Sequence, residues 1–132
     1  MKAPDTIAKV LRAISDDKSL ILFRAIAHET SGIDANQLWD QAKFTRKQYY
    51  SRMEKMHKAG LIKKRSGKYF LTSFGKVIYE TLRIAENGLD NYWKLKAMDS
   101  LMTTSDLPND EQRKALDTLL DNDELKRIVQ GD

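Results

Sequence analysis

Two helix-start signals stand close together near the middle of the chain, and they restrict its fold more than any other feature. Asp34 and Thr45 are residue types that cap helices, because their side-chain oxygens can accept a hydrogen bond from the first turn. Each is followed three residues later by a glutamine, Gln37 or Gln48, whose side chain can reach back to the backbone of the capping residue. The repeated signature predicts two helices with only a short turn between them.

The borders of these two helices are also marked. Hydrophobic-staple pairs, which set the direction of the chain as it enters a helix, are present at both starts: Ile33 with Leu38, and Phe44 with Tyr49. We expect the first helix to end at about Ala42 and the second to cover about 46–59. Gly60 can stop the second helix in a left-handed conformation, with Met56 and Leu61 placed for the apolar contact that accompanies such a stop.

A helical wheel divides the second helix into two sides. The predicted core side carries Tyr49, Tyr50, Met53, Met56 and His57. The opposite side carries polar and positively charged groups: Lys47, Gln48, Ser51, Arg52, Lys55 and Lys58. One side can therefore anchor the helix while the other presents hydrogen-bond donors to solvent.

Residues 61–72 change to an alternating pattern that indicates a β-hairpin, with Ser66-Gly67 as its turn. This turn predicts the strand register: Ile62 opposite Leu71 and Lys64 opposite Tyr69 on one face, and Lys63 opposite Phe70 and Arg65 opposite Lys68 on the other. Arg65 and Lys68 then place like charges across the tip. A phosphate between them would remove the repulsion, although a solvated tip that protects a strand edge is the alternative.

Helical patterns flank this central region on both sides. Upstream, one pattern begins near Pro4, breaks at 15–17, and is followed by a strongly apolar helix over about 18–30. Downstream, we expect a helix from Thr72-Ser73 through Ala85, followed by a break or kink at Asn87-Gly88. Apolar spacing resumes over 89–101, and a loop is expected over 103–108. Two acidic helices are expected after it, over 109–121 and 123–130. If the helix runs through Gly88, a short apolar seam results, made of Leu82, Ala85, Leu89 and Tyr92.

Positive charge is concentrated in one segment. The chain of 132 residues has a net charge of +4, but residues 43–68 alone hold ten basic side chains against one acidic side chain, Glu54. The rest of the chain carries an excess of acidic groups. This asymmetry is typical of a patch that binds a polyanion, and a merely solvated basic face is the alternative.

The segment from Thr45 to Ile62 resembles the reading helix of winged helix-turn-helix transcription regulators. In that family, apolar residues lie seven and four positions before the glycine of a Gly-Leu-Ile end, and here Met53 and Met56 fill those positions before Gly60. Tyr69-Phe-Leu-Thr-Ser-Phe-Gly75 is similar to the junction between the wing and the next helix in the same family. The likeness covers about residues 5–86, and the part from Asp106 onward resembles tails of archaeal regulators.

The resemblance implies a mainly α fold with a small β-hairpin, DNA binding, commonly as a dimer, and transcription control. We expect a DNA-binding domain over 1–86 and a C-terminal helical extension over 87–132 that dimerises through Tyr92, Trp93 and Met98, unless these pack back on residues 5–30. The predicted DNA-contacting residues are Thr45, Arg46, Lys47, Gln48, Ser51, Arg52, Lys55, Lys63, Arg65 and Lys68.

The donors on the reading helix have different expected roles. Gln48 can bond to an adenine edge, and Arg52 either to a guanine edge or simply to phosphate. Ser51 suits either base or phosphate, whereas Arg46, Lys47 and Lys55 suit phosphates, which position the protein without specifying sequence. Tyr49 is predicted to be a core residue, with base stacking as the alternative.

Other function classes find little support. The chain has no cysteine, and its two histidines, His28 and His57, lack partners at ligand spacing, so we expect no metal or cofactor. No catalytic motif is present, so we expect no enzyme. The chain start lacks the order of a signal peptide and no apolar run could span a membrane, so we expect a cytoplasmic protein. Two alternatives to a regulator that binds double-stranded DNA stay open: a winged-helix module for protein contacts in a transcription or other assembly, and an RNA-binding module.

Overall fold

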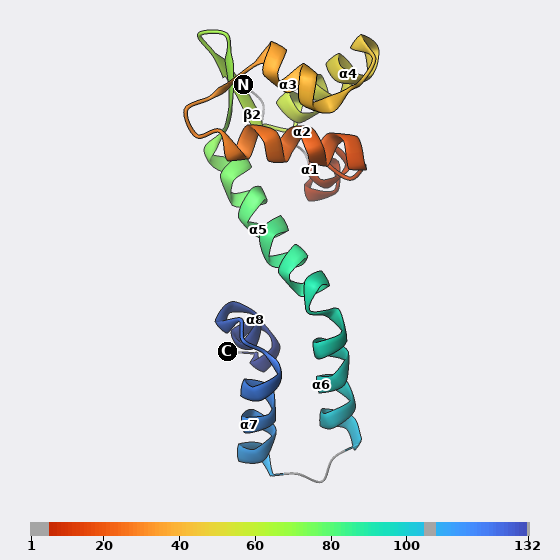
Figure 1. Cartoon of the computed structure of the whole chain (residues 1–132), viewed down its shortest axis with the longest axis vertical. Helices are drawn as coiled ribbons and strands as arrows, with labels where there is room; N and C mark the ends of the chain where they lie inside the picture. Colours follow the sequence, from red (N-terminus) through yellow and green to blue (C-terminus); the bar gives the residue numbers. More distant parts are fainter. Residues whose placement is uncertain (1–5, 105–107, 132) are drawn as a thin grey trace. The chain divides into compact units, whose positions relative to one another are not determined.

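The computed structural model describes residues 6–104 and 108–131 and consists of two compact units, residues 1–80 and 81–132. The described part of the chain holds eight helices and three short strands (Figure 1). A mainly helical fold with a small β-hairpin was expected, and this coarse prediction is confirmed. Among the described residues, no helix combines the length and apolarity that crossing a membrane would need.

The helices of the first unit begin at residues whose side chains cap them. Thr6 caps α1 (Ile7–Arg12), and Asp16 caps α2 (Asp17–His28) by accepting a 2.8 Å hydrogen bond from the Ser19 N–H. The predicted start near Pro4 lies outside the described residues, and within them α1 begins at Ile7. Helix α2 ends at His28, two residues before its predicted end.

Helices α3 (Ala35–Ala42) and α4 (Arg46–Lys58) follow as the capping signatures predict, with a turn over 43–45. Asp34 accepts from the Gln37 N–H, and both predicted staple pairs are buried. At the end of α4, Gly60 has a φ of +77° and the Leu61 N–H donates to the Met56 carbonyl at 3.0 Å. This is the predicted left-handed stop.

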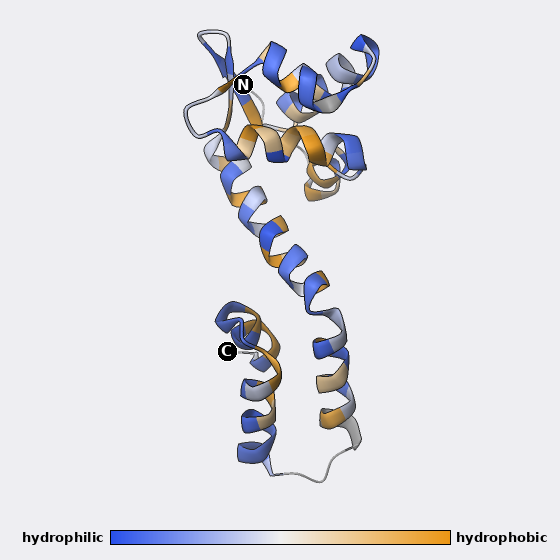
Figure 2. Ribbon diagram, in the orientation of Figure 1, coloured by the Kyte–Doolittle hydropathy of each residue, from blue (hydrophilic) through white to orange (hydrophobic). Residues whose placement is uncertain are grey.

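The core of the first unit is built on α2, whose hydrophobic side is orange in Figure 2. Leu22, Phe23 and Ile26 are almost completely buried, but Ile21 remains 45% exposed, so α2 has a solvent side that its near-continuous apolar sequence did not indicate. Other core side chains come from α3, α4 and the segment that follows α4: Leu38, Met53, Met56, Leu61 and Ile62. The core thus fixes α4 to α2 and to the hairpin.

Three strands form a small antiparallel sheet in the order β1-β3-β2, namely β1 (Ile33–Asp34), β2 (Ile62–Arg65) and β3 (Lys68–Leu71). The hairpin register matches the prediction at all four pairs. Ser66 and Gly67 both have positive φ, which a tight two-residue turn requires. Strand β1 was not predicted, because two residues are too short for an alternating pattern, and its pairing with β3 is a tertiary contact.

Helix α5 (Ser73–Asp90) starts against the end of α4. The Thr72 hydroxyl donates to the Gly60 carbonyl and accepts from the Gly75 N–H, while the Thr72 N–H donates to the Leu61 carbonyl at 3.0 Å. A Cβ added to Gly75 would lie 2.1 Å from the Leu61 carbonyl oxygen, so only glycine fits here. The bonds from Thr72 therefore join the residue that follows β3 to Gly60 and Leu61, which precede β2.

The predicted break at Asn87-Gly88 is wrong in position. Helix α5 continues through Gly88 to Asp90, and the break falls at Asn91, whose side chain donates to the Asn87 carbonyl at 2.8 Å. One glycine costs a helix only about 1 kcal/mol, which neighbouring turns can offset. A continuous helix through Gly88 was expected to form an apolar seam. The side chains of that seam are partly or fully exposed in the chain: Leu82, Ala85, Leu89 and Tyr92.

The second unit contains the end of α5 together with α6 (Tyr92–Thr104), α7 (Asn109–Leu119) and α8 (Asp123–Gln130). Its own small core joins Met98 of α6 to Leu116, Leu120 and Leu125. Met98 is therefore not available for dimerisation, because α7 and α8 already cover it. Tyr92 and Trp93 stay exposed, as a dimer surface would require.

Candidate nucleic-acid interface

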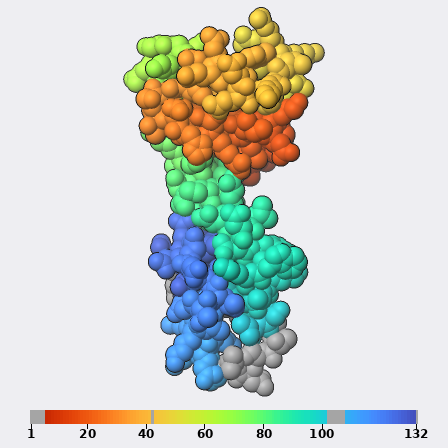
Figure 3. Space-filling model, in the orientation of Figure 1, coloured from red at the N-terminus to blue at the C-terminus, as the bar shows by residue number. Residues whose placement is uncertain are grey.

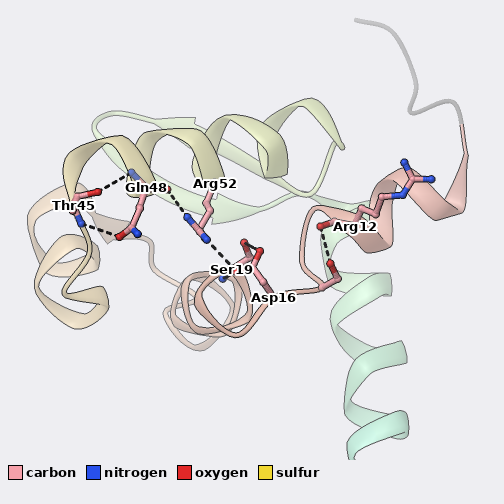
Figure 4. A network of polar contacts seen from close by, with 7 residues as sticks. Arg12, Asp16, Ser19, Thr45, Gln48 and Arg52 are labelled. Atoms are coloured by element: carbon pink, nitrogen blue, oxygen red, sulfur yellow. Dashed lines mark hydrogen bonds and ion pairs between the residues drawn. The ribbon is translucent and has the colours of Figure 1, made fainter.

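The start of α4 is held by two reciprocal hydrogen bonds between Thr45 and Gln48. The Gln48 N–H donates to the Thr45 hydroxyl, and the Thr45 N–H donates to the Gln48 side-chain oxygen, both at 3.2 Å (Figure 4). Two of the ten predicted contact residues thus have capping roles. Gln48 is half-buried, and its side-chain oxygen is already bonded, so reading an adenine edge would require the cap to open.

Arg52 does not extend into solvent. Its Nε lies 3.2 Å from Oδ1 of Asp16, the residue that caps α2, and its Nη1 donates to the Gln48 carbonyl at 3.3 Å (Figure 4). The guanidinium also lies 5.8 Å from the centre of the Phe44 ring. The side chain is only 24% exposed, so Arg52 links α4 to α2 in this structure.

The buried side of α4 is narrower than the wheel predicted. Tyr49, Met53 and Met56 are buried, but Tyr50 is 63% exposed and His57 is also exposed. The wheel assigned the two sides by apolarity alone, whereas the rotation of the helix depends on what it packs against. Tyr49 is a core residue as predicted, its ring 5.3 Å from that of Trp39. Burial, with smaller effects of the neighbouring Tyr69 and Tyr50, raises the Tyr49 pKa far above its ordinary range.

The outward side of α4 carries Arg46, Lys47, Ser51 and Lys55, all predicted contact residues and all exposed. Lys58 is exposed as well, but its Nζ lies 3.0 Å from Glu54 one turn away. Within the described part of the chain, no ion pair engages Arg46, Lys47 or Lys55. Their charges are therefore available to an external anion.

The hairpin supplies the remaining predicted contacts. Lys63, Arg65 and Lys68 are exposed, and Arg65 pairs directly with Lys68 across the turn. Among the described residues, neither has an ion-pair partner that would relieve the repulsion. Lys64, on the other face, lies with its Nζ 5.5 Å from the centre of the Tyr69 ring.

Helix α4 and the hairpin belong to the same unit, and α4 contacts β2. In the space-filling view, the start of α4 (yellow) and the hairpin (light green) are both at the surface at one end of this unit (Figure 3). The fold therefore leaves eight of the ten predicted residues exposed on α4, its cap and the hairpin: Thr45, Arg46, Lys47, Ser51, Lys55, Lys63, Arg65 and Lys68.

Sequence reasoning missed two parts of this region. One is Asp16, which lies in the predicted break at 15–17, and no local pattern indicates its pairing with an arginine 36 residues away. The other is a cleft between α4 and the hairpin, which includes Tyr50 and His57 from the side of the helix that was predicted to be core. Within residues 6–104 and 108–131, no cluster of three or more His, Asp or Glu side chains could hold a metal ion.

Comparison of the chain with family models, with curated proteins and with solved structures found no match. Its function is therefore inferred from the geometry and charge of these residues.

Proposed function

We propose that the first unit is a winged helix-turn-helix that binds double-stranded DNA with sequence selectivity and regulates transcription. In this proposal α4 enters the major groove, and the β2–β3 hairpin is the wing, which lies on the backbone or in the minor groove. The observation that carries the proposal is the set of exposed basic groups without ion-pair partners, within the described residues, on α4 and the hairpin: Arg46, Lys47, Lys55, Lys63, Arg65 and Lys68.

Helix α4 has the two sides that binding in a major groove requires. A helix in the major groove needs one buried side that holds it and one outward side that meets the bases, and α4 has both. Ser51 lies on the outward side and is assigned a base contact, whereas Lys47 beside it is assigned to a phosphate. Arg52 is assigned to positioning, because contact with a guanine would first require its bond to Asp16 to break.

The proposal also includes a homodimer formed through the second unit. Leu89 is 72% exposed and Trp93 is 77% exposed, which leaves large apolar groups in water in a single chain. A second copy would cover them. Dimeric regulators bind two half-sites, so a palindromic preferred site is expected.

Binding to a fluorescent random duplex over a series of salt concentrations tests the DNA proposal with the full chain. Five phosphate contacts predict a slope of about −4.5 for log K against log salt, since each neutralised phosphate releases about 0.9 counterion. Replacing Lys47, Lys55, Lys63, Arg65 and Lys68 by glutamine is expected to abolish most of this slope. A matched control replaces five basic residues of the second unit: Lys94, Lys96, Arg113, Lys114 and Arg127.

The control removes the same charge and is expected to leave the slope nearly unchanged. An equal loss in both variants would show that only net charge matters, which would contradict the assigned interface. Failure of the unaltered chain to bind duplex DNA would instead favour a module for protein contacts, and preference for an RNA hairpin would favour an RNA-binding module. Selection of bound sites from a random duplex pool then identifies the preferred sequence and its symmetry.

A further inference from the structure

A cleft of about 380 Å³ lies between α4 and the hairpin. Met53 and Ile62 are its buried apolar residues. Tyr50 and His57 line it from α4, and Lys64 and Tyr69 line it from the hairpin, so both elements of the proposed interface contribute to it.

The lining combines an apolar surface with polar groups. Tyr50 and Tyr69 carry hydroxyl donors, and Lys64 carries a positive charge. His57 Nδ1 lies 3.3 Å from the Ile62 carbonyl oxygen, so this edge of the ring faces β2. Glu54 also lines the cleft, but its carboxylate is paired with Lys58 at 3.0 Å, which offsets its negative charge.

This chemistry fits a sugar–phosphate chain. A deoxyribose presents apolar carbon–hydrogen surface, and a phosphate accepts hydrogen bonds from lysine, tyrosine and similar donors. The geometry of B-DNA adds a second argument. Its major and minor grooves are about 12 Å and 6 Å wide and are separated by a single strand of backbone. A protein with a helix in the major groove and a hairpin on the adjacent minor groove must have that strand between the two elements.

We propose that the cleft between α4 and the hairpin seats the sugar–phosphate backbone that separates the two grooves, with Lys64 and Tyr50 as phosphate contacts. This inference rests on the proposed DNA-binding function. It adds a DNA contact on the side of α4 that carries Tyr50, which apolarity alone assigns to the core. It also adds Lys64, which lies on the opposite face of the hairpin from Lys63, Arg65 and Lys68.

Ethylation interference on a duplex site obtained by selection tests the inference with the full chain. The variants are Lys64→Gln and Tyr50→Phe, and Lys94→Gln in the second unit is the matched control. Lys64 and Tyr50 are exposed, so neither change is expected to alter the melting curve. We expect Lys64→Gln to weaken binding about tenfold and to reduce the salt slope by about one. Tyr50→Phe is expected to weaken binding about threefold with no change in slope, because it removes a neutral donor.

The interference pattern supplies the readout that affinity alone lacks. Ethylation of one phosphate between the grooves is expected to block the unaltered chain and to lose its effect in Lys64→Gln, while the control keeps the full pattern. If the chain binds duplex DNA but both variants retain its affinity and pattern, the cleft inference is overturned and the proposed function survives. If the chain binds no duplex at all, both fail together.

Discussion

The guanidinium of Arg52 on α4 bonds to the carboxylate of Asp16, with Nε 3.2 Å from Oδ1. Asp16 also accepts from the Ser19 N–H at 2.8 Å and from the Ser19 hydroxyl at 2.9 Å, so one carboxylate both caps α2 and holds α4. This contact joins two helices that are distant in sequence, and it turns Arg52, which was predicted to bond to a guanine edge or to a phosphate, toward the protein.

A double-mutant cycle measures this contact. Asp16→Ala is expected to lower the free energy of unfolding by about 1 kcal/mol through loss of the cap, and Arg52→Met removes the charge while it keeps an apolar stem on Phe44. Both groups are partly exposed, so solvent screening limits their coupling to about 0.5–1 kcal/mol. Urea unfolding of the two single variants and the double variant gives the value. Strict additivity would mean that the ion pair contributes nothing to stability.

The same carboxylate gives the stability of the first unit an acid dependence. Burial by itself raises the pKa of Asp16, but the hydrogen bonds from Ser19 and Arg52 and the Arg52 charge outweigh it, so the net pKa is lowered. A lowered pKa means that the stabilisation is complete above the pKa of the unfolded chain, about 3.9, and is lost as the pH falls below it. Unfolding followed between pH 6 and about pH 2 is expected to show a shallower acid decline in Asp16→Asn. An identical decline in both proteins would contradict the role of Asp16.

Two glycines in α5 are expected to respond to alanine in opposite directions. At Gly75, a Cβ would lie 2.1 Å from the Leu61 carbonyl oxygen, so Gly75→Ala should lower the free energy of unfolding by about 1–3 kcal/mol. At Gly88, a Cβ would meet nothing within 4 Å, so Gly88→Ala should stabilise it by about 0.5–1 kcal/mol. Thermal unfolding of both variants tests the pair. Destabilisation by Gly88→Ala would show that the helix does not continue through this position.

Exposed apolar groups of the second unit are expected to control self-association. Leu89→Ser and Trp93→Ser should each weaken the proposed dimer by about 2 kcal/mol, or roughly thirtyfold in Kd, as expected for central aromatic and aliphatic anchors. Sedimentation equilibrium measures the effect. Ile21→Ser is the control, because Ile21 is 45% exposed but belongs to the first unit. A chain that is monomeric before any substitution would remove the dimer from the proposal.

Local signals predicted much of the first unit. The capping residues Asp34 and Thr45, the glycine stop at Gly60 and the turn at Ser66-Gly67 act within a few residues of chain, and each has its predicted conformation or bond. The hairpin register follows from the turn alone, because a two-residue loop leaves one way to pair the strands. Resemblance to winged-helix regulators and DNA binding itself stay predictions.

Long-range contacts determined the rest. Strand β1 exists only because β3 lies beside it, and Met98 is buried only because α7 and α8 cover it. Apolarity on a wheel could not show that Tyr50 and His57 are exposed, since the rotation of α4 depends on what it packs against.

By itself, the sequence determined where helices begin and end around α3 and α4, how the hairpin pairs, and that positive charge is concentrated over 43–68. These features depend on neighbours along the chain, whose geometry the backbone limits to a few conformations. Only the tertiary structure decided which of those charges are available. It paired Arg52 with Asp16 and left Lys47 and Lys55 in solvent, because the partner of a charged side chain is set by the packing of distant helices.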